Sequence, residues 1–353
     1  MNAESTVTTV SGRSHHGARR LRRWKALSLA RPVRSGGVHL VVASCAIRSS
    51  LTSQKTLQYD PNIVAQRIMG VPSHTGLHCR TLEHMVSSTL PFFSSSRFLP
   101  FAHRGGSEET LENTLPAFQA AYDAGFRYFE TDLHATRDGV VVAFHDDNLE
   151  RIAGVPGTIG DCTYKDLRSL TLRDPAHRAV PSRSDVLHLS IPTLEELFTT
   201  FPDCSFNLDL KHDACLVPLV RIIRAHQLED RICAGSFDDA RLARFRIHTH
   251  GRVATSMGPR AVLDARIRSF LFHRTSRHEA DCIQVPVRAY GIPILTRSFI
   301  DAAHRSGLPV HAWTINDAPL MEHLLDLGID GIMTDRPHLL RTVLAERGLW
   351  ENR

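Results

Sequence analysis

Two histidines in this 353-residue chain each follow a short apolar run. His103 stands directly before Arg104 and two glycines, and His145 follows the run at 140–144. An imidazole titrates near neutral pH and suits proton transfer, whereas a guanidinium matches two phosphate oxygens at once. The glycines allow a close backbone approach to a ligand. A single histidine at a strand end is commonly structural, but this combination indicates acid–base chemistry on a phosphate.

Three carboxylates indicate a cation site. Glu130 and Asp132 are two residues apart, so both side chains point to the same face of a predicted strand. Two uncompensated buried carboxylates are costly, and a divalent cation with oxygen ligands removes that cost. Asp209 and Lys211 share a strand face in the same way. We interpret Asp209 as a third ligand and Lys211 as facing an anionic substrate. The alternative in each case is an ion pair with Arg or Lys.

Polar residues at other predicted strand ends are weaker candidates. Trp313 could floor a pocket for an alcohol group, or it could pack in the core. We interpret Asp335 and Arg336 as a local ion pair or helix cap, and residues 146–147 as the start of a turn.

Alternating strands and helices must position these residues. Short apolar runs separated by amphipathic stretches begin at residue 98, and a short strand is expected at 140–144. The other predicted strands occupy residues 98–102, 127–133, 205–210, 232–235, 253–255, 282–285, 309–313 and 331–333. About eight β/α units of this kind are typical of a TIM (β/α)8 barrel, whose site lies at the carboxyl ends of its strands. A doubly wound sheet is the alternative, but no G-x-G-x-x-G turn follows the first strand.

The chain divides into two unlike parts. We expect the barrel over residues 98–350 and a largely disordered basic extension over 1–97. Residues 1–98 hold 13 Lys/Arg and 3 Asp/Glu, so they carry +10 and the remainder carries −5 of the total of +5. The basic cluster at 19–25 also suits a nucleic-acid patch, a membrane-surface helix or a transit peptide. Translation could instead start at Met85.

Composition excludes several classes of protein. The basic charge belongs to the extension, so it does not indicate that the barrel binds nucleic acid. No apolar run reaches the roughly 18 residues that a membrane helix needs, so no stable membrane insertion is expected. The seven cysteines include no C-x-x-C pair, which indicates neither a zinc site nor a redox motif. We expect reduced thiols, a cytoplasmic location and a small-molecule partner.

Nine short segments carry a family resemblance. They are His103-Arg104-Gly105, Glu112-Asn113-Thr114, Glu130-x-Asp132, Asp138-Gly139, His145-Asp146 with Arg151, Pro192-Thr193-Leu194-Glu195-Glu196, Asp209-x-Lys211, Trp313-Thr314-x-Asn316, and Gly328-x-Asp330-Gly331-Ile332-x-Thr334-Asp335-x-Pro337. Together they resemble the glycerophosphodiester phosphodiesterase family and occur in that family's order. Each segment alone is a weak signal, whereas nine in order are very specific.

The resemblance implies a TIM-barrel enzyme that hydrolyses glycerophosphodiesters to sn-glycerol 3-phosphate and an alcohol, in glycerophospholipid breakdown. It implies one divalent cation, Mg²⁺ or Ca²⁺, and the carboxylates that would bind it are Glu130, Asp132 and Asp209. It implies an acid/base pair, His103 and His145. The phosphate would lie near Arg104 and Lys211. The attacking group is either water or the neighbouring glycerol hydroxyl.

The chain departs from the family pattern at two places. The family's third carboxylate is commonly Glu, where this chain has Asp209, and hydroxyl residues usually follow the arginine that corresponds to Arg151, where this chain has Ile152-Ala153. A lysophospholipase D-like lipid phosphodiesterase is one alternative function, with residues 270–272 either forming an apolar rim or packing in the core. The other is a catalytically silent barrel that binds glycerophosphodiesters.

Overall fold

Eight strands form the barrel, and we describe them from a computed structural model that covers residues 90–94, 98–108, 110–173 and 189–350. The barrel strands are β1 (Leu99–His103), β2 (Tyr128–Ala135), β4 (Ser205–Leu210), β5 (Ile232–Gly235), β6 (Ala254–Thr255), β7 (Ile283–Val285), β10 (Val310–Ala312) and β11 (Gly331–Thr334). Their order is β6-β5-β4-β2-β1-β11-β10-β7, and every neighbouring pair is parallel. A parallel bridge between Ser256 and Cys282 joins the two ends of this order. The predicted TIM barrel is therefore confirmed.

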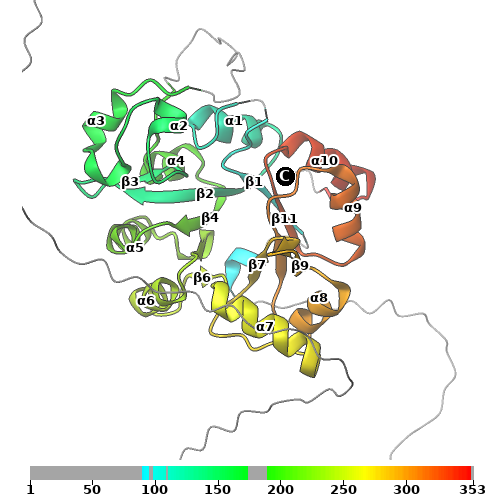
Figure 1. Cartoon of the computed structure of the whole chain (residues 1–353). Coiled ribbons are helices and arrows are strands. Elements are labelled where there is room, and N and C mark those ends of the chain that lie inside the picture. The colour runs from blue at the N-terminus through cyan, green and yellow to red at the C-terminus, as the bar shows by residue number, and fades with distance from the viewer. Residues whose placement is uncertain (1–89, 95–97, 109, 174–188, 351–353) are drawn as a thin grey trace, which may run out of the picture. The chain divides into compact units, whose positions relative to one another are not determined.

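Helices surround these strands (Figure 1). They are α1 (Leu115–Asp123), α2 (Glu150–Ala153), α3 (Tyr164–Arg168), α4 (Leu194–Thr200), α5 (Leu216–His226), α6 (Asp239–Thr249), α7 (Pro259–Phe272), α8 (Arg297–His304), α9 (Ala318–Asp326) and α10 (Pro337–Glu346). Short 3-10 turns lie at η1 (Pro91–Phe93), η2 (Ile159–Asp161), η3 (Asp213–Cys215) and η4 (Glu229–Arg231). Each predicted barrel strand lies within a residue or two of its expected position.

Local hydrogen bonds set where two helices begin. The Thr193 side chain accepts a hydrogen bond from the backbone N–H of Glu196, and the Glu196 carboxylate accepts one from the backbone N–H of Thr193. Thr163 and Asp166 form the same capping box at α3. Each box satisfies two backbone donors that a helix start leaves without partners.

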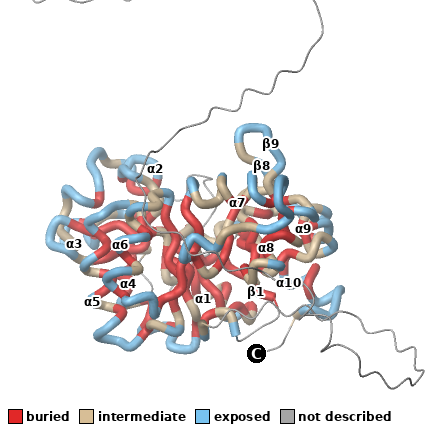
Figure 2. Tube along the Cα trace, turned by 90° about the horizontal axis from the view of Figure 1, so that it is seen from below, coloured by how far each residue is buried: buried red, intermediate tan, exposed pale blue. Residues whose placement is uncertain are grey.

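Two strand pairs lie outside the barrel order. The predicted strand near 140–144 is β3 (Val141–Ala143), which pairs antiparallel with the end of β2. The hairpin of β8 (Arg288–Ala289) and β9 (Ile292–Pro293) was not predicted. Its turn residues Tyr290 and Gly291 both have positive φ, which suits the tight turn of a two-residue hairpin. The hairpin projects from the barrel in Figure 2.

The strands are buried between an outer helical layer and the barrel interior (Figure 2). Phe92 of η1 is 1% exposed and packs inside the barrel with Phe101 and Tyr128. The Tyr128 hydroxyl donates to the Phe92 carbonyl oxygen at 3.2 Å. Burying a phenylalanine contributes about 1.5–3 kcal/mol of stability. Residues 1–89, which include the basic cluster and Met85, lie outside the described residues. The division of the chain into an extension and a barrel at residue 98 therefore stays a prediction.

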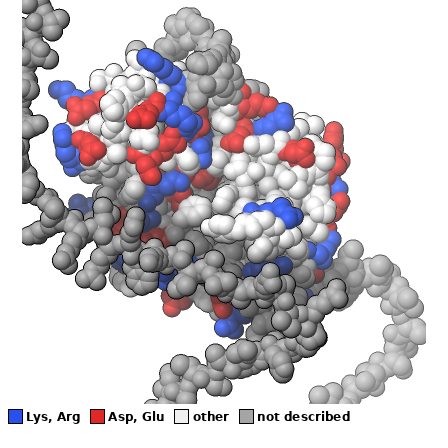
Figure 3. Space-filling model, viewed as in Figure 1, with Lys and Arg blue, Asp and Glu red and all other residues white. Residues whose placement is uncertain are grey.

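Two expectations concern the surface of the molecule, one about membrane insertion and one about residues 270–272. No helix in the described part of the chain is long and apolar enough to cross a membrane. Phe270, Leu271 and Phe272 are exposed at the end of α7, so the expectation that they pack in the core is wrong. They also form no rim at the mouth, because α7 runs back from the end of β6 to the start of β7. Figure 3 shows acidic and basic side chains interspersed on the visible face.

Candidate active site

The register of the barrel strands brings the predicted residues together. His103 at the end of β1 lies opposite Glu130 on β2. Asp132, two residues further along β2, lies opposite Asp209 on β4. Lys211 follows directly after β4. These positions lie at or near the carboxyl ends of the strands, where a TIM barrel carries its site.

Lys211 joins two of the predicted metal ligands. Its Nζ lies 2.7 Å from Asp132 Oδ1 and 2.7 Å from Asp209 Oδ2. Arg104 Nε lies 3.1 Å from Asp132 Oδ2, although its N–H does not point at that oxygen, so the contact is an ion pair without a hydrogen bond. Burial raises the pKa of Asp132, but Lys211 and Arg104 outweigh it, so the pKa of Asp132 is lowered. Ion pairing therefore compensates Asp132.

Glu130 has no such compensation. Its side chain is 5% exposed, and Oε2 has no hydrogen-bond donor among the described residues. The nearest cationic group recorded for it is His103, whose Nε2 lies 3.6 Å from Oε2. Burial, followed by the neighbouring Asp132, raises the pKa of Glu130. A buried carboxylate oxygen without a donor, beside two further carboxylates, fits a hard cation with oxygen ligands.

His103 is held by Asp335. Its Nδ1 lies 2.6 Å from Asp335 Oδ1, and the Asn316 amide donates to Asp335 Oδ2 at 2.7 Å. Burial lowers the pKa of His103, but Glu130 and Asp335 outweigh it, so the pKa of His103 is raised. The prediction that Asp335 and Arg336 form a local ion pair or a helix cap is wrong, because Arg336 pairs with Glu108 instead and α10, whose N-cap residue is Arg336, has no side-chain cap. Asp335 therefore belongs to the site at the mouth of the barrel, where it contacts His103.

His145 is held in the same manner by its neighbour. Its Nδ1 lies 2.7 Å from Asp146 Oδ1, so Asp146 does more than begin a turn. Arg151 donates to both oxygens of Asp146 and to both oxygens of Glu112. Glu112 also accepts from Arg104 Nη1 at 2.9 Å. Ion pairs therefore connect the loop that carries His145 to the loop that carries Arg104.

This network is rich in negative charge. Within the described residues, the site at the barrel mouth includes six carboxylates, Glu112, Glu130, Asp132, Asp146, Asp209 and Asp335. It contains three permanent cations, Arg104, Arg151 and Lys211. A proton on Glu130 or His103, or a bound cation, would reduce this excess negative charge. The donor set and the charge together fit a divalent cation.

Comparison with known proteins decides the family. The sequence profile described as the glycerophosphoryl diester phosphodiesterase family matches residues 103–339. The chain belongs to this family. The resemblance drawn from the nine segments is thereby confirmed, and the protein is an enzyme of the phosphodiesterase class.

Individual relatives agree with this assignment. The probable glycerophosphodiester phosphodiesterase 2 of Mycobacterium tuberculosis is 37% identical over 268 residues, which are 74% of this chain and 97% of that protein. The human lysophospholipase D GDPD1 is 26% identical, and the match covers 70% of this chain and 87% of that protein. A phosphodiesterase structure from Oleispira antarctica, in complex with the product sn-glycerol-3-phosphate, superposes with a TM-score of 0.60 at 22% identity. The superposition covers 74% of this chain and 99% of that chain, and it supports the fold.

The two glycines that follow Arg104 are required by the packing of the fold. A Cβ added at Gly105 would lie 2.7 Å from the backbone nitrogen of Phe118, and one added at Gly106 would lie 2.7 Å from Pro337 Cγ. Both residues have positive φ. Close packing of the chain against itself therefore requires these glycines, whereas the sequence pattern predicted close approach to a ligand.

Trp313 lies at the mouth beside a second aromatic ring. Its side chain is half-buried, and its ring centroid lies 5.8 Å from that of Phe237 at an angle of 79°. Lys211 Nζ lies 6.0 Å from the centre of the Phe237 ring. The two rings thus stand near a predicted phosphate-binding group, and the role of Trp313 in a substrate pocket stays a prediction.

Sequence reasoning missed the residues that orient the two histidines. Asp335 was interpreted only as part of a local ion pair or helix cap and Asp146 only as the start of a turn, and Asn316 and Glu112 lay inside matched segments without a role. One signal could have identified Asp335. The last strand of a TIM barrel closes against the first, so a carboxylate just after the last strand approaches the end of the first strand.

Proposed function

We propose that this enzyme hydrolyses glycerophosphodiesters to sn-glycerol 3-phosphate and an alcohol, with a divalent cation. One observation carries the proposal: two imidazoles at the barrel mouth each contact a carboxylate through Nδ1. These pairs are His103 with Asp335, at 2.6 Å, and His145 with Asp146, at 2.7 Å. Membership of the family and the name of the Mycobacterium tuberculosis relative support the substrate class.

The cation would be Mg²⁺ or Ca²⁺, held by Glu130, Asp132 and Asp209. The orphaned Glu130 Oε2 and the absence of a hydrogen-bond donor at Asp132 Oδ2, within the described part of the chain, support this assignment. When bound, the cation supplies positive charge to the phosphoryl oxygens in the transition state. Asp209 is one methylene shorter than the usual Glu, and it reaches Lys211 Nζ at 2.7 Å.

The two histidines perform the proton transfers. A carboxylate at Nδ1 fixes the orientation of each ring, so that Nε2 exchanges the proton with the substrate. One imidazole takes the proton from the attacking oxygen as the new P–O bond forms. That oxygen belongs either to water or to the neighbouring glycerol hydroxyl, whose cyclic phosphate product is then opened by water. The other gives a proton to the alcohol oxygen as its P–O bond breaks. Proton transfer of this kind typically contributes a factor of about 10²–10⁴ in rate.

Two basic side chains and two aromatic rings complete the proposed binding site. Arg104 and Lys211 offset the charge on the phosphoryl oxygens. Trp313 and Phe237 form an apolar wall near Lys211, suited to the alcohol part of the substrate.

The test measures sn-glycerol 3-phosphate released from glycerophosphocholine by the purified chain. The chain is first treated with EDTA, and Mg²⁺ or Ca²⁺ is then restored. We expect EDTA to abolish release and one of the cations to restore it. Binding of glycerophosphocholine by folded protein, without release under either cation, would contradict the proposal and favour a silent binding barrel.

A lysolipid is the second candidate substrate. Phe237 is 66% exposed, and Tyr290 and Ile292 project from the hairpin that follows β7 at the mouth side of the barrel. These apolar side chains could contact an acyl chain, and the human relative is named a lysophospholipase D. Faster turnover of lysophosphatidylcholine than of glycerophosphocholine, lost in Phe237→Ala, would favour this candidate.

A further inference from the structure

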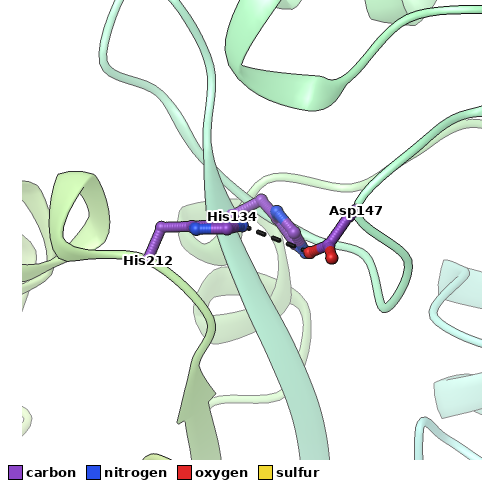
Figure 4. A group of neighbouring side chains, drawn as sticks. All are labelled: His134, Asp147 and His212. Atoms are coloured by element: carbon purple, nitrogen blue, oxygen red, sulfur yellow. Dashed lines mark ion pairs between the residues drawn. The ribbon is translucent and has the colours of Figure 1, made fainter. Parts of the chain in front are cut away.

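A second group of metal-binding side chains lies beside the carboxylate site. It consists of His134 on β2, Asp147 in the loop after β3, and His212 just after Lys211 (Figure 4). One possible ligand atom from each residue lies within 4.8 Å of the other two. His212 Nε2 already lies 3.3 Å from Asp147 Oδ1. Three separate segments of the chain thus converge on one point.

We propose that His134, Asp147 and His212 bind a transition-metal cation such as Zn²⁺, at a site distinct from the carboxylate site. Two imidazoles and one carboxylate form a nitrogen and oxygen donor set that Zn²⁺ accepts readily, whereas Mg²⁺ and Ca²⁺ prefer oxygen ligands alone. Tetrahedral Zn²⁺ with ligand bonds near 2.1 Å holds its ligand atoms roughly 3.3 Å apart. The pair formed by Asp147 and His212 already has this separation.

The buried histidine provides a fixed ligand. His134 is 3% exposed, and its ring packs edge-on against Phe144, with 6.3 Å between the ring centroids. Its Nε2 contacts the backbone carbonyl oxygen of His145 at 3.4 Å. This contact is long, and it uses only one of the two ring nitrogens of His134. Metal-bound histidines commonly direct their second nitrogen to a backbone carbonyl in this way. His134 is therefore positioned before any cation arrives.

The other two ligands are accessible from solvent. The side chains of Asp147 and His212 are 82% and 53% exposed, so they can move by the small distance that a metal requires. The ring centroids of His134 and His212 are 5.1 Å apart. The adjacent Lys211 does not repel a cation strongly, because Asp132 and Asp209 neutralise its ammonium group at 2.7 Å each.

Occupancy of this site would restrain the loop that carries His145. Asp147 lies two residues after His145, and His134 contacts the His145 carbonyl. A cation at the site would tie this loop to β2 and to the segment after β4. Binding itself does not depend on the proposed function, because none of the three ligands takes part in it.

The test measures Zn²⁺ binding by isothermal titration of the full-length chain. The protein is freed of metal with a chelator, which is then removed, and the titration is run with excess Mg²⁺ to fill the carboxylate site. His212→Ala and Asp147→Asn remove exposed ligands and avoid the buried His134. The control is His226→Ala, since His226 Nε2 lies 3.3 Å from Glu195 Oε1 at comparable exposure but belongs to no three-residue group among the described residues.

We expect the wild-type chain to bind one Zn²⁺. The affinity for Zn²⁺ should fall at least about 10-fold in His212→Ala and in Asp147→Asn, and it should be unchanged in His226→Ala. Equal Zn²⁺ binding by all four proteins would overturn the proposal. Loss of the Zn²⁺ site in Glu130→Gln, with retention in His212→Ala, would also overturn it and would place the ion at the carboxylates. Because binding is measured without substrate, these outcomes are independent of phosphodiesterase activity.

Discussion

Asp335 Oδ1 lies 2.6 Å from His103 Nδ1, although 232 residues separate the two in the sequence. The contact follows from the parallel pairing of β1 with β11, in which Ala102 lies opposite Thr334. The residue after each of these positions therefore lies at the same end of the barrel. Asn316 fixes the other oxygen of Asp335, so the carboxylate cannot turn away from the imidazole.

Removal of this carboxylate's charge should impair turnover more than binding. We expect Asp335→Asn to reduce kcat about 10- to 100-fold with a smaller change in KM, because the amide no longer stabilises the imidazolium. The pKa of His103 should fall, and the corresponding limb of the kcat pH profile should move to lower pH. The control is Asp264→Asn, which breaks an exposed carboxylate–histidine pair of similar length to His278. An unaltered pH profile in Asp335→Asn would show that Asp335 has only a structural role.

Removal of either imidazole should stop the proton transfers. We expect His103→Ala and His145→Ala each to reduce turnover of glycerophosphocholine by about 100-fold or more, with an unchanged circular dichroism spectrum. Both variants should still bind the cation, because neither histidine is among its proposed ligands. Near-full activity in both variants would refute the acid/base assignment.

The buried Glu130 should make the stability of the metal-free protein depend on pH. Burial and the neighbouring Asp132 raise the pKa of Glu130 to about 7, above its value of about 4.3 in an unfolded chain. The folded protein therefore favours the protonated form of Glu130. The free energy of unfolding that this protonated carboxyl contributes is fully present below about pH 4.3 and is lost as the pH rises through about 7. Glu130→Gln stays neutral and should avoid this loss.

Urea unfolding in EDTA at pH 5 and pH 8 checks this prediction. We expect Glu130→Gln to be more stable than wild type at pH 8, by on the order of 1–3 kcal/mol, and the difference to shrink at pH 5. Adding Mg²⁺ or Ca²⁺ should stabilise the wild type more than the variant. A difference that is equal at both pH values would mean that Glu130 is not buried in its charged form.

Phe92 should contribute to the stability of the barrel from outside the predicted domain. We expect Phe92→Ala to lower the free energy of unfolding by about 3 kcal/mol or more, because the ring is 1% exposed against Phe101 and Tyr128. Phe93→Ala is the matched control, since Phe93 is only half-buried, and it should cost less. A chain that starts at Met85 keeps Phe92 and should match the full-length protein in urea unfolding, whereas one that starts at Phe98 should be less stable.

The sequence alone was sufficient for most local structure. Strands β4 and β5 lie at the predicted residues 205–210 and 232–235. Apolar periodicity, caps and breakers act over a few residues, so they can be read without knowledge of the fold. Hairpin β8–β9 was missed because Tyr290-Gly291 lacks the Asn-Gly or Asp-Gly pair typical of such turns.

The types of the chemical groups were also readable from the sequence, and the nine ordered segments were sufficient to predict the family. Only the tertiary structure decided which groups meet. The partner of His103 depends on barrel closure, and the convergence of His134, Asp147 and His212 depends on the pairing of the β2–β3 hairpin with the more distant β4. Such contacts are set by strand order and register over long sequence separations. No local pattern encodes them, because each side chain's own neighbours in sequence are the same whether or not its distant partner is present.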